Sequence, residues 1–455
     1  MPVTELKLSN IGPFDEIELT FDRQVNILTG PNNTGKSTIL WALGELLVFP
    51  FTLPERSLKD PTSTWQIRMT SNDNIYNFSG SFPVDITDDL IEAYKAIGYT
   101  CYIPGQRYST DFRSPGPGSA RDLDVHIDAH LELISQARPS LVHRMPPAEL
   151  RSFLHRAQQQ EDPELSKRTR LLLSAPLLLS NHTLIQKIID LDYASLRLNR
   201  PEIRQVFGSV ISIASDITEG FPLEFAGIGE DNRGLYPKVK TLTEELPMDS
   251  LSQGTMSVIH CLAQLIFGYA EYYDFPEDLA TRPGTVIIDE IDAHLHPSWQ
   301  RRIIPTLTDH FPNLQIFCST HSPLMLAGLE AQQVHLLRQD ASGGISVSPS
   351  PSDIFGWTAD EILRHIFGLP EPTDLSTTQS LQRLASLRRR RDLSAAEREE
   401  LECLRARVGT QIMNAPMAAE IARMASEVQE AIARPDDSAS GSGREGDDSP
   451  DGSRP

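Results

Sequence analysis

The chain begins with short runs in which apolar and polar residues alternate, the pattern of half-buried strands. The runs "TELKLSNI" (4–11) and "EIELTF" (16–21) alternate in this way, whereas "RQVNILTG" (23–30) is more continuously apolar. Directly afterwards, "STILWALGELL" (37–47) places apolar residues at helical spacing. This order predicts an antiparallel flap, then a buried strand, a loop and a helix.

Further along, the pattern divides the chain into five segments. Residues 1–122 indicate strands around one helix, and residues 123–207 change to long polar helices with leucine at helical spacing. Residues 208–345 return to strands and helices, and we expect them to join residues 1–122 in one α/β unit. Residues 346–434 indicate helices, and residues 435–455 an acidic disordered tail rich in Gly, Ser, Asp and Pro.

The helical segment near the carboxyl end carries the main basic run of the chain, "LRRRRD" (387–392). It lies in a predicted helical hairpin whose second arm begins with a capping box from Ser394 to Glu397. Acidic residues follow soon after, in "EREELE". A solvated face of the hairpin is therefore favoured over a nucleic-acid grip, although a local contact with DNA or RNA stays open.

Charge and composition narrow the classes of function. The formal net charge of −21 over 455 residues argues against a surface that binds nucleic acid everywhere. No apolar run is long enough to span a membrane and no signal peptide is evident, so we expect a soluble, cytoplasmic protein without a membrane partner. The four cysteines are far apart, and we expect free buried thiols at Cys101, Cys261, Cys318 and Cys403.

The loop between the first buried strand and its helix has the form G-x-x-x-x-G-K-S, from Gly30 to Ser37. Such a loop curls its backbone N–H groups around phosphates, its lysine reaches the β- and γ-phosphates, and its serine ligates Mg²⁺. The strand–loop–helix context supports this interpretation over an ordinary turn. The residues expected to bind the nucleotide are Gly30, Pro31, Asn32, Asn33, Thr34, Gly35, Lys36, Ser37 and Thr38.

Three later stretches carry matching chemistry. The apolar run "GTVIIDE" (284–290) ends in Asp289, placed to hold Mg²⁺, and Glu290, which can polarise the attacking water. The run "NLQIFCSTHS" (313–322) ends near His321, a candidate γ-phosphate sensor. In "DSLSQGTMSVIH" (249–260), Ser252 and Gly254 open a helix whose N–H groups point outward. This helix is expected to cap the nucleotide of another copy of the chain.

Together these motifs, in this order, resemble those of ABC-type ATPase heads, and more closely the RecF/SMC/OLD branch. "LKLSNIGPF", "GPNNTGKST", "LSQGT", "IIDEIDAHLHP" and "STHSP" carry the resemblance. It implies an α/β P-loop NTPase fold with an antiparallel N-terminal β-subdomain, a helical insertion and a C-terminal helical hairpin. It also implies ATP and Mg²⁺ as cofactors, catalysis by Lys36, Glu290 and His321, and a head-to-tail dimer or higher oligomer.

Some positions depart from the family pattern or stay open. The glutamine that completes the Mg²⁺ and nucleotide shell in this family is Gln106 by our assignment, with Gln66 as the alternative. The signature carries Gln253 and Thr255, and no long coiled coil separates the two halves. The H-x-H pair "HLH" (294–296) indicates a contact between copies rather than a metal site, because no other His/Cys cluster accompanies it.

The sequence after residue 321 lacks the acidic strand ends of a Toprim nuclease and any HNH-like cluster. An ATPase without its own effector is expected to control a separate one. The organisation resembles the ATPase subunit of the Septu type of anti-phage defence, whose partner is an HNH nuclease, and which also occurs beside some retrons. A RecF-like ATPase that acts on DNA in repair or recombination is the main alternative, and a transporter subunit is a weaker one.

Overall fold

The computed structural model describes residues 2–47, 63–71, 74–81, 97–103, 181–218, 222–232, 234–340, 343–369, 375–390 and 393–413. These belong to two compact units, residues 1–369 and 370–455. The predicted tail and most of the predicted helical insertion lie outside the described residues.

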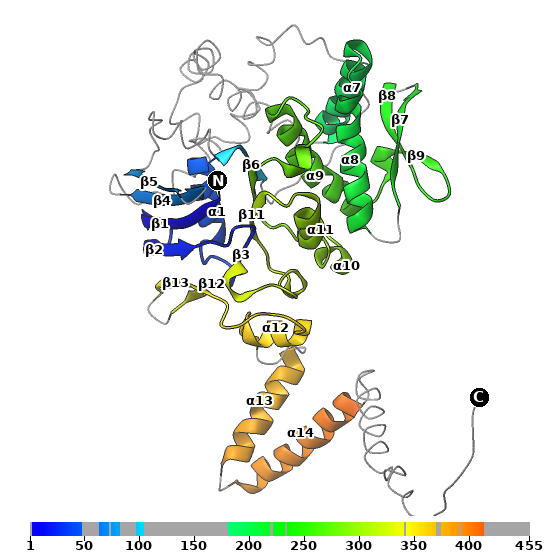
Figure 1. Cartoon of the computed structure of the whole chain (residues 1–455). Coiled ribbons are helices and arrows are strands. Elements are labelled where there is room, and N and C mark those ends of the chain that lie inside the picture. Colours follow the sequence, from blue (N-terminus) through cyan, green and yellow to red (C-terminus); the bar gives the residue numbers. More distant parts are fainter. Residues whose placement is uncertain are drawn as a thin grey trace, which may run out of the picture. The chain divides into compact units, whose positions relative to one another are not determined.

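A six-stranded sheet forms the centre of the first unit (Figure 1). Its order is β13-β12-β3-β11-β10-β6, in which β13 is antiparallel to β12 and the other neighbouring pairs are parallel. The strands are β3 (Val25–Thr29), β6 (Tyr99–Ile103), β10 (Gly284–Ile288), β11 (Leu314–Ser319), β12 (Val334–Gln339) and β13 (Ile345–Pro349). The continuous apolar runs of the sequence correspond to β3, β6, β10 and β11, all of whose residues are buried.

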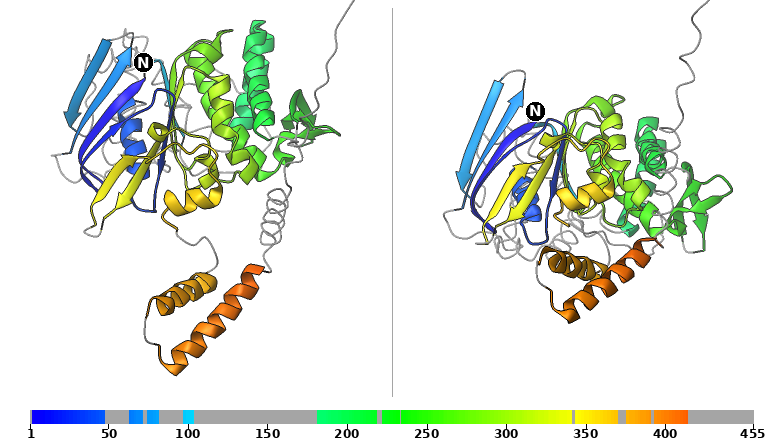
Figure 2. Two further views of the ribbon diagram at one scale, coloured as in Figure 1. Left: turned by 60° about the horizontal axis from the view of Figure 1, so that its bottom comes forward. Right: turned by 90° about the horizontal axis from the view of Figure 1, so that it is seen from below.

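An antiparallel sheet covers one side of this central sheet, as the alternating runs predict (Figure 2). Its order is β2-β1-β4-β5, and helix α1 shares its apolar core. Along β10 and β11, Ile287 and Phe317 face this core, whereas Ile288 and Cys318 face the core on the other side. The elements are β1 (Val3–Ile11), β2 (Phe14–Thr20), α1 (Lys36–Leu47), β4 (Thr64–Ser71) and β5 (Asn74–Ser81).

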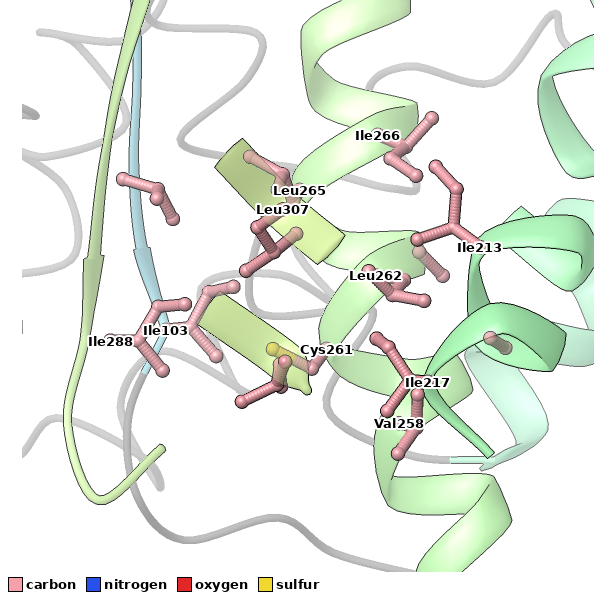
Figure 3. Close-up of a cluster of buried hydrophobic side chains, with 14 of the residues drawn as sticks. Ile103, Ile213, Ile217, Val258, Cys261, Leu262, Leu265, Ile266, Ile288 and Leu307 are labelled. Atoms are coloured by element: carbon pink, nitrogen blue, oxygen red, sulfur yellow. The ribbon is translucent and has the colours of Figure 1, made fainter. Parts of the chain in front are cut away.

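Helices fill the second core. Ile103 and Ile288 face Leu265 of α9 and Leu307 of α11, while Ile217 of α8 packs on the far side of α9 (Figure 3). The helices on this side are α7 (Asn181–Leu198), α8 (Pro201–Ile217), α9 (Gln253–Tyr272), α10 (Pro297–Gln300), α11 (Ile303–His310) and α12 (Ala359–His365). A small sheet adds β7 (Glu224–Asp231), β8 (Gly234–Lys240) and β9 (Glu245–Pro247), and single 3₁₀ turns are η3 (Met248–Ser250), η4 (Leu279–Thr281), η5 (Pro323–Met325) and η6 (Ala331–Gln333). The α/β fold with an antiparallel N-terminal sheet is thus confirmed.

Two expected segment boundaries fall inside elements. Helix α8 crosses the limit set at residue 207, because its apolar face continues to Ile217 in the second core. The limit at residue 345 falls at the start of β13, which pairs with β12, and residues up to 369 belong to the first unit. No helix among the described residues is long and apolar enough to cross a membrane.

The second unit contains the predicted helical hairpin, α13 (Leu375–Arg389) and α14 (Ala395–Met413). The capping box is confirmed, since the Ser394 N–H donates to Glu397 Oε2 at 2.8 Å and the Glu397 N–H donates to Ser394 Oγ at 3.3 Å. Arg383 and Glu400 form a bidentate pair across the hairpin, and Arg390 pairs with Glu397. Some of the basic residues of this region therefore form ion pairs with acidic residues of the same hairpin.

The cysteines are free, but the expected burial is wrong for one of them. Cys101, Cys261 and Cys318 are buried, whereas Cys403 is exposed because α14 has no apolar stripe to bury. Burial raises the pKa of the Cys101 thiol to about 12, which makes this thiol unreactive at neutral pH.

The buried histidine of β12, His335, predicts a pH dependence of stability. Its Nε2 lies 3.2 Å from Asn26 Oδ1, and burial lowers its pKa to about 4. In the unfolded chain His335 becomes protonated below about pH 6.5, whereas in the folded chain it stays neutral down to about pH 4. Acidification between these values therefore favours the unfolded state and destabilises the fold. Between about pH 6.5 and pH 4, the free energy of unfolding of the wild type should fall by about 3 kcal/mol more than that of the His335→Gln variant. Urea unfolding at several pH values measures this; parallel profiles would contradict it.

Candidate functional site

The strand order brings three of the predicted motifs to one edge of the central sheet. Strands β3, β11 and β10 are adjacent and parallel, so their carboxyl ends lie side by side. The phosphate-binding loop follows β3, the acids Asp289 and Glu290 follow β10, and His321 follows β11. Ligands of open α/β sheets bind at this edge.

The two glycines of the loop meet geometric demands that other residues would not. Gly30 has φ +145°, and a Cβ there would lie 2.3 Å from the Leu337 carbonyl oxygen of β12. Gly35 has φ +89°, and its Cβ would lie 2.5 Å from the Phe14 ring of the N-terminal hairpin. Strand β12 of the same sheet and β2 of the antiparallel sheet thus both lie close to the loop. Asn33 adds a third residue with positive φ, at 64°.

Lys36, the first residue of α1, is buried at the base of the loop. Its Nζ donates to the carbonyl oxygens of Gly30 at 3.0 Å and Pro31 at 2.8 Å. Burial lowers the pKa of Lys36, and the nearby carboxylates of Asp289, Glu290 and Asp292 oppose this shift. The ammonium group therefore lies within electrostatic reach of the acids that follow β10, although they come from a distant part of the sequence.

The two acids after β10 have different surroundings. Asp289 is buried, and its Oδ1 accepts a hydrogen bond from the Ser319 hydroxyl. Glu290 is exposed, has a left-handed φ of 50°, and its N–H donates to the same hydroxyl oxygen at 2.8 Å. A fixed, buried carboxylate suits a metal's water shell, and an exposed one suits polarisation of a water.

His321 lies on the same edge. Burial lowers its pKa, and Lys36 lowers it further, while Asp292, Glu290 and Asp289 act in the opposite direction. Its backbone N–H approaches Asp292 Oδ1 at 3.4 Å, and that oxygen also accepts from Thr320 Oγ1 at 2.7 Å. The lowered pKa favours the neutral imidazole, whose ring N–H can donate a hydrogen bond to a phosphate oxygen.

The signature residues lie elsewhere. Ser252 caps α9 by accepting from the Thr255 N–H at 3.2 Å. Gly254 packs against the segment after β10, since a Cβ there would lie 3.0 Å from the Trp299 ring and 3.1 Å from the His294 carbonyl oxygen. Helix α9 packs on β6, which is three strands from β3, a separation of roughly 14 Å at ordinary strand spacing. Helix α9 packs in the second core, whereas α1, which follows the loop, packs in the core on the other face of the sheet.

The glutamine assignment stays open. Gln106 lies outside the described residues. Gln66 is exposed in the middle of β4, whose alternate residues Trp65 and Ile67 face the core shared with α1. Gln66 therefore points away from α1, which does not favour it as a nucleotide ligand.

His294 and His296 are both exposed in the turn before α10. His296 Nδ1 accepts from the Ser298 N–H at 3.3 Å and so caps this short helix. No group of three or more His, Cys, Asp or Glu residues that could hold a metal is present in the described part of the chain.

The residues present fit Mg²⁺ bound together with a nucleotide. Ser37, half-buried in the first turn of α1, and the buried Asp289 supply hydroxyl and carboxylate oxygens, the donors that Mg²⁺ prefers. Mg²⁺ is commonly held by one or two such groups plus substrate phosphates rather than by an all-protein cage. When bound, it would neutralise charge on the phosphates.

Sequence reasoning assigned no role to several side chains that connect the motifs. Ser319, Thr320 and Asp292 join the segments after β10 and β11, as described above. Gln300 of α10 accepts from Ser322 Oγ at 2.6 Å and donates to the Leu295 carbonyl oxygen at 3.0 Å. Ser319, Thr320 and Asp292 lie within the quoted motifs "STHS" and "IDAHLHP", whereas Gln300 lies outside them, and the partners of all four depend on the tertiary fold.

Two stretches of the chain match models of known protein families, and several curated proteins are similar to it. Residues 146–327 match a family model described as "AAA domain, putative AbiEii toxin, Type IV TA system", and residues 5–57 match one described as "AAA domain". The Septu protein PtuA of Bacillus thuringiensis is 23% identical over 81% of this chain and 85% of that protein. The chain is thus similar to PtuA and to proteins with AAA domains, in agreement with its resemblance to ABC-type ATPase heads of the RecF/SMC/OLD branch.

Other relatives of this ATPase match over shorter stretches. The retron Vc95 probable ATPase of Vibrio cholerae serotype O1 biovar El Tor is 34% identical over 26% of this chain and 23% of that protein. The retron Ec83 probable ATPase of Escherichia coli is 30% identical over 30% of this chain and 24% of that protein. Among solved structures, the SMC head domain from Thermotoga maritima aligns over 77% of this chain and 99% of that chain, with 13% identity and a TM-score of 0.39.

Proposed function

We propose that this ATPase is the nucleotide-hydrolysing subunit of a prokaryotic anti-phage complex and controls a separate, HNH-type nuclease. The observation that carries the proposal is the similarity to Septu PtuA over most of both chains, 81% of this one and 85% of the other. Such an extent includes regions outside the nucleotide motifs, so it bears on more than ATP binding.

Assembly of two copies is the proposed output of ATP binding. Helix α9, which Ser252 caps, packs in a different core from α1 of the loop, and the N–H groups at its N-terminus suit a phosphate. Two copies arranged head to tail would each place this cap on the other's ATP. Hydrolysis would then dismantle the contact, because the cap binds the γ-phosphate that is lost.

Within each copy, the proposed roles follow from the edge of the sheet. Lys36 and the loop hold the phosphates, Ser37 and Asp289 hold Mg²⁺, and Glu290 polarises the attacking water. His321 contacts the γ-phosphate. The nuclease chemistry belongs to the partner subunit, since these motifs all serve the nucleotide.

Co-expression with the products of neighbouring genes tests the proposal. We expect a nuclease to co-purify with the chain and its activity on DNA to change at least about tenfold between ATP and no nucleotide. The Lys36→Ala variant should co-purify but lose this response. Absence of any nuclease partner, together with ATP turnover stimulated by DNA alone, would instead favour the RecF-like alternative.

A further inference from the structure

Ser319 is the last residue of β11 and is 1% exposed. The parallel register pairs Cys318 with Ile288, the last residue of β10. The residues that come next in the chain, Ser319 and Asp289, therefore lie side by side. The register therefore places a hydroxyl beside the first acid of the site.

The hydrogen bonds of this serine have only one consistent direction. A backbone N–H can only donate, so Ser319 Oγ accepts from the Glu290 N–H at 2.8 Å. The single hydroxyl hydrogen is then free to bind Asp289 Oδ1, which is the contact observed. The Ser319 carbonyl oxygen also accepts from the Ile291 N–H at 3.1 Å. One residue thus holds three consecutive residues of the acidic segment.

Each of these contacts constrains one acid. Glu290 has a left-handed φ of 50°, a strained conformation for a residue with a side chain, which persists only where surrounding contacts hold it. The bond to its N–H fixes the backbone from which the Glu290 carboxylate projects. The bond to Asp289 Oδ1 fixes the rotation of that carboxylate, so that its other oxygen is available to the metal's water shell.

We propose that the Ser319 hydroxyl is a positioning residue for ATP hydrolysis, which orients Asp289 toward Mg²⁺ and Glu290 toward the attacking water at once. The inference rests on the proposed roles of these two acids and adds a residue to them. Ser319 is not among the residues proposed to bind the phosphates. Its substitution should therefore change kcat and the Mg²⁺ dependence of the rate rather than the affinity for ATP.

The test compares steady-state ATP hydrolysis and Mg²⁺ titrations of the full-length variants. Ser319→Ala should lower kcat by about 10- to 100-fold and raise the Mg²⁺ concentration for half-maximal rate by about tenfold. The affinity for ATP should stay within about threefold. Ser319→Cys, which keeps the volume but bonds weakly, should behave like Ser319→Ala, and Ser319→Thr should restore most of the rate.

Ser350→Ala is the matched control, since it also removes a buried hydroxyl that donates one hydrogen bond, to the Ser352 carbonyl oxygen at 2.8 Å. It lies beyond β13 and should leave kcat unchanged. If both Ser319→Ala and Ser319→Cys keep the wild-type kcat and Mg²⁺ dependence, the inference about Ser319 is overturned. The proposed function would then still stand. A folded wild-type protein that does not hydrolyse ATP would overturn the proposed function instead.

Discussion

Replacing Glu290 by Gln should lower ATP turnover by at least about 100-fold while nucleotide binding stays within a few-fold of wild type. A general base contributes 10² to 10⁴ in rate, and the amide cannot accept the proton of the attacking water. The substitution keeps the shape of an exposed side chain and leaves the N–H that donates to Ser319 in place. Binding without hydrolysis should therefore accumulate the ATP-bound assembly.

Two measurements check this result. Phosphate release gives the turnover, and light scattering coupled to size-exclusion chromatography gives the mass with ATP and Mg²⁺. The dimer should persist in Glu290→Gln and decay in wild type. The control Glu277→Gln changes an exposed glutamate in the loop after α9 and should behave as wild type. Ordinary turnover in Glu290→Gln would remove this residue from the role of base.

Replacing Lys36 by Ala should weaken ATP binding by at least about 100-fold, which corresponds to roughly 3 kcal/mol. Lys36 is the buried cation of the loop. Removing one partner of a buried, hydrogen-bonded charge pair weakens binding by about 2 to 5 kcal/mol. The variant should still fold, because burial disfavours the charged ammonium group of Lys36 and lowers its pKa. Hydrolysis and ATP-dependent dimerisation should both be lost.

Equilibrium titration with a fluorescent ATP analogue measures this affinity, and thermal melting without nucleotide verifies the fold. Lys240→Ala is the control, because Lys240 on β8 is exposed and forms a surface ion pair with Glu224 at 3.5 Å. Unchanged affinity in Lys36→Ala would mean that the loop after β3 does not hold the phosphates.

The sequence alone determined the local features of this protein. The buried strands β3, β10 and β11 are continuous apolar runs, and the alternating runs became the antiparallel sheet, because periodicity follows from burial on one face or two. The phosphate loop was recognisable because its glycines are required by the local backbone conformation, since Gly30 and Gly35 both have positive φ. Cys403 was misjudged, because burial depends on what packs against a helix.

Only the tertiary structure decided which of these features meet. The order β3-β11-β10 brings Lys36, Asp289 and His321 to one edge although more than 280 residues separate the first from the last. The register of β10 with β11 places the Ser319 hydroxyl in contact with both acids, and packing places α9 and α1 in different cores. Periodicity reports how each segment is buried, whereas strand order and register arise from packing between segments distant in the sequence, which no local pattern encodes.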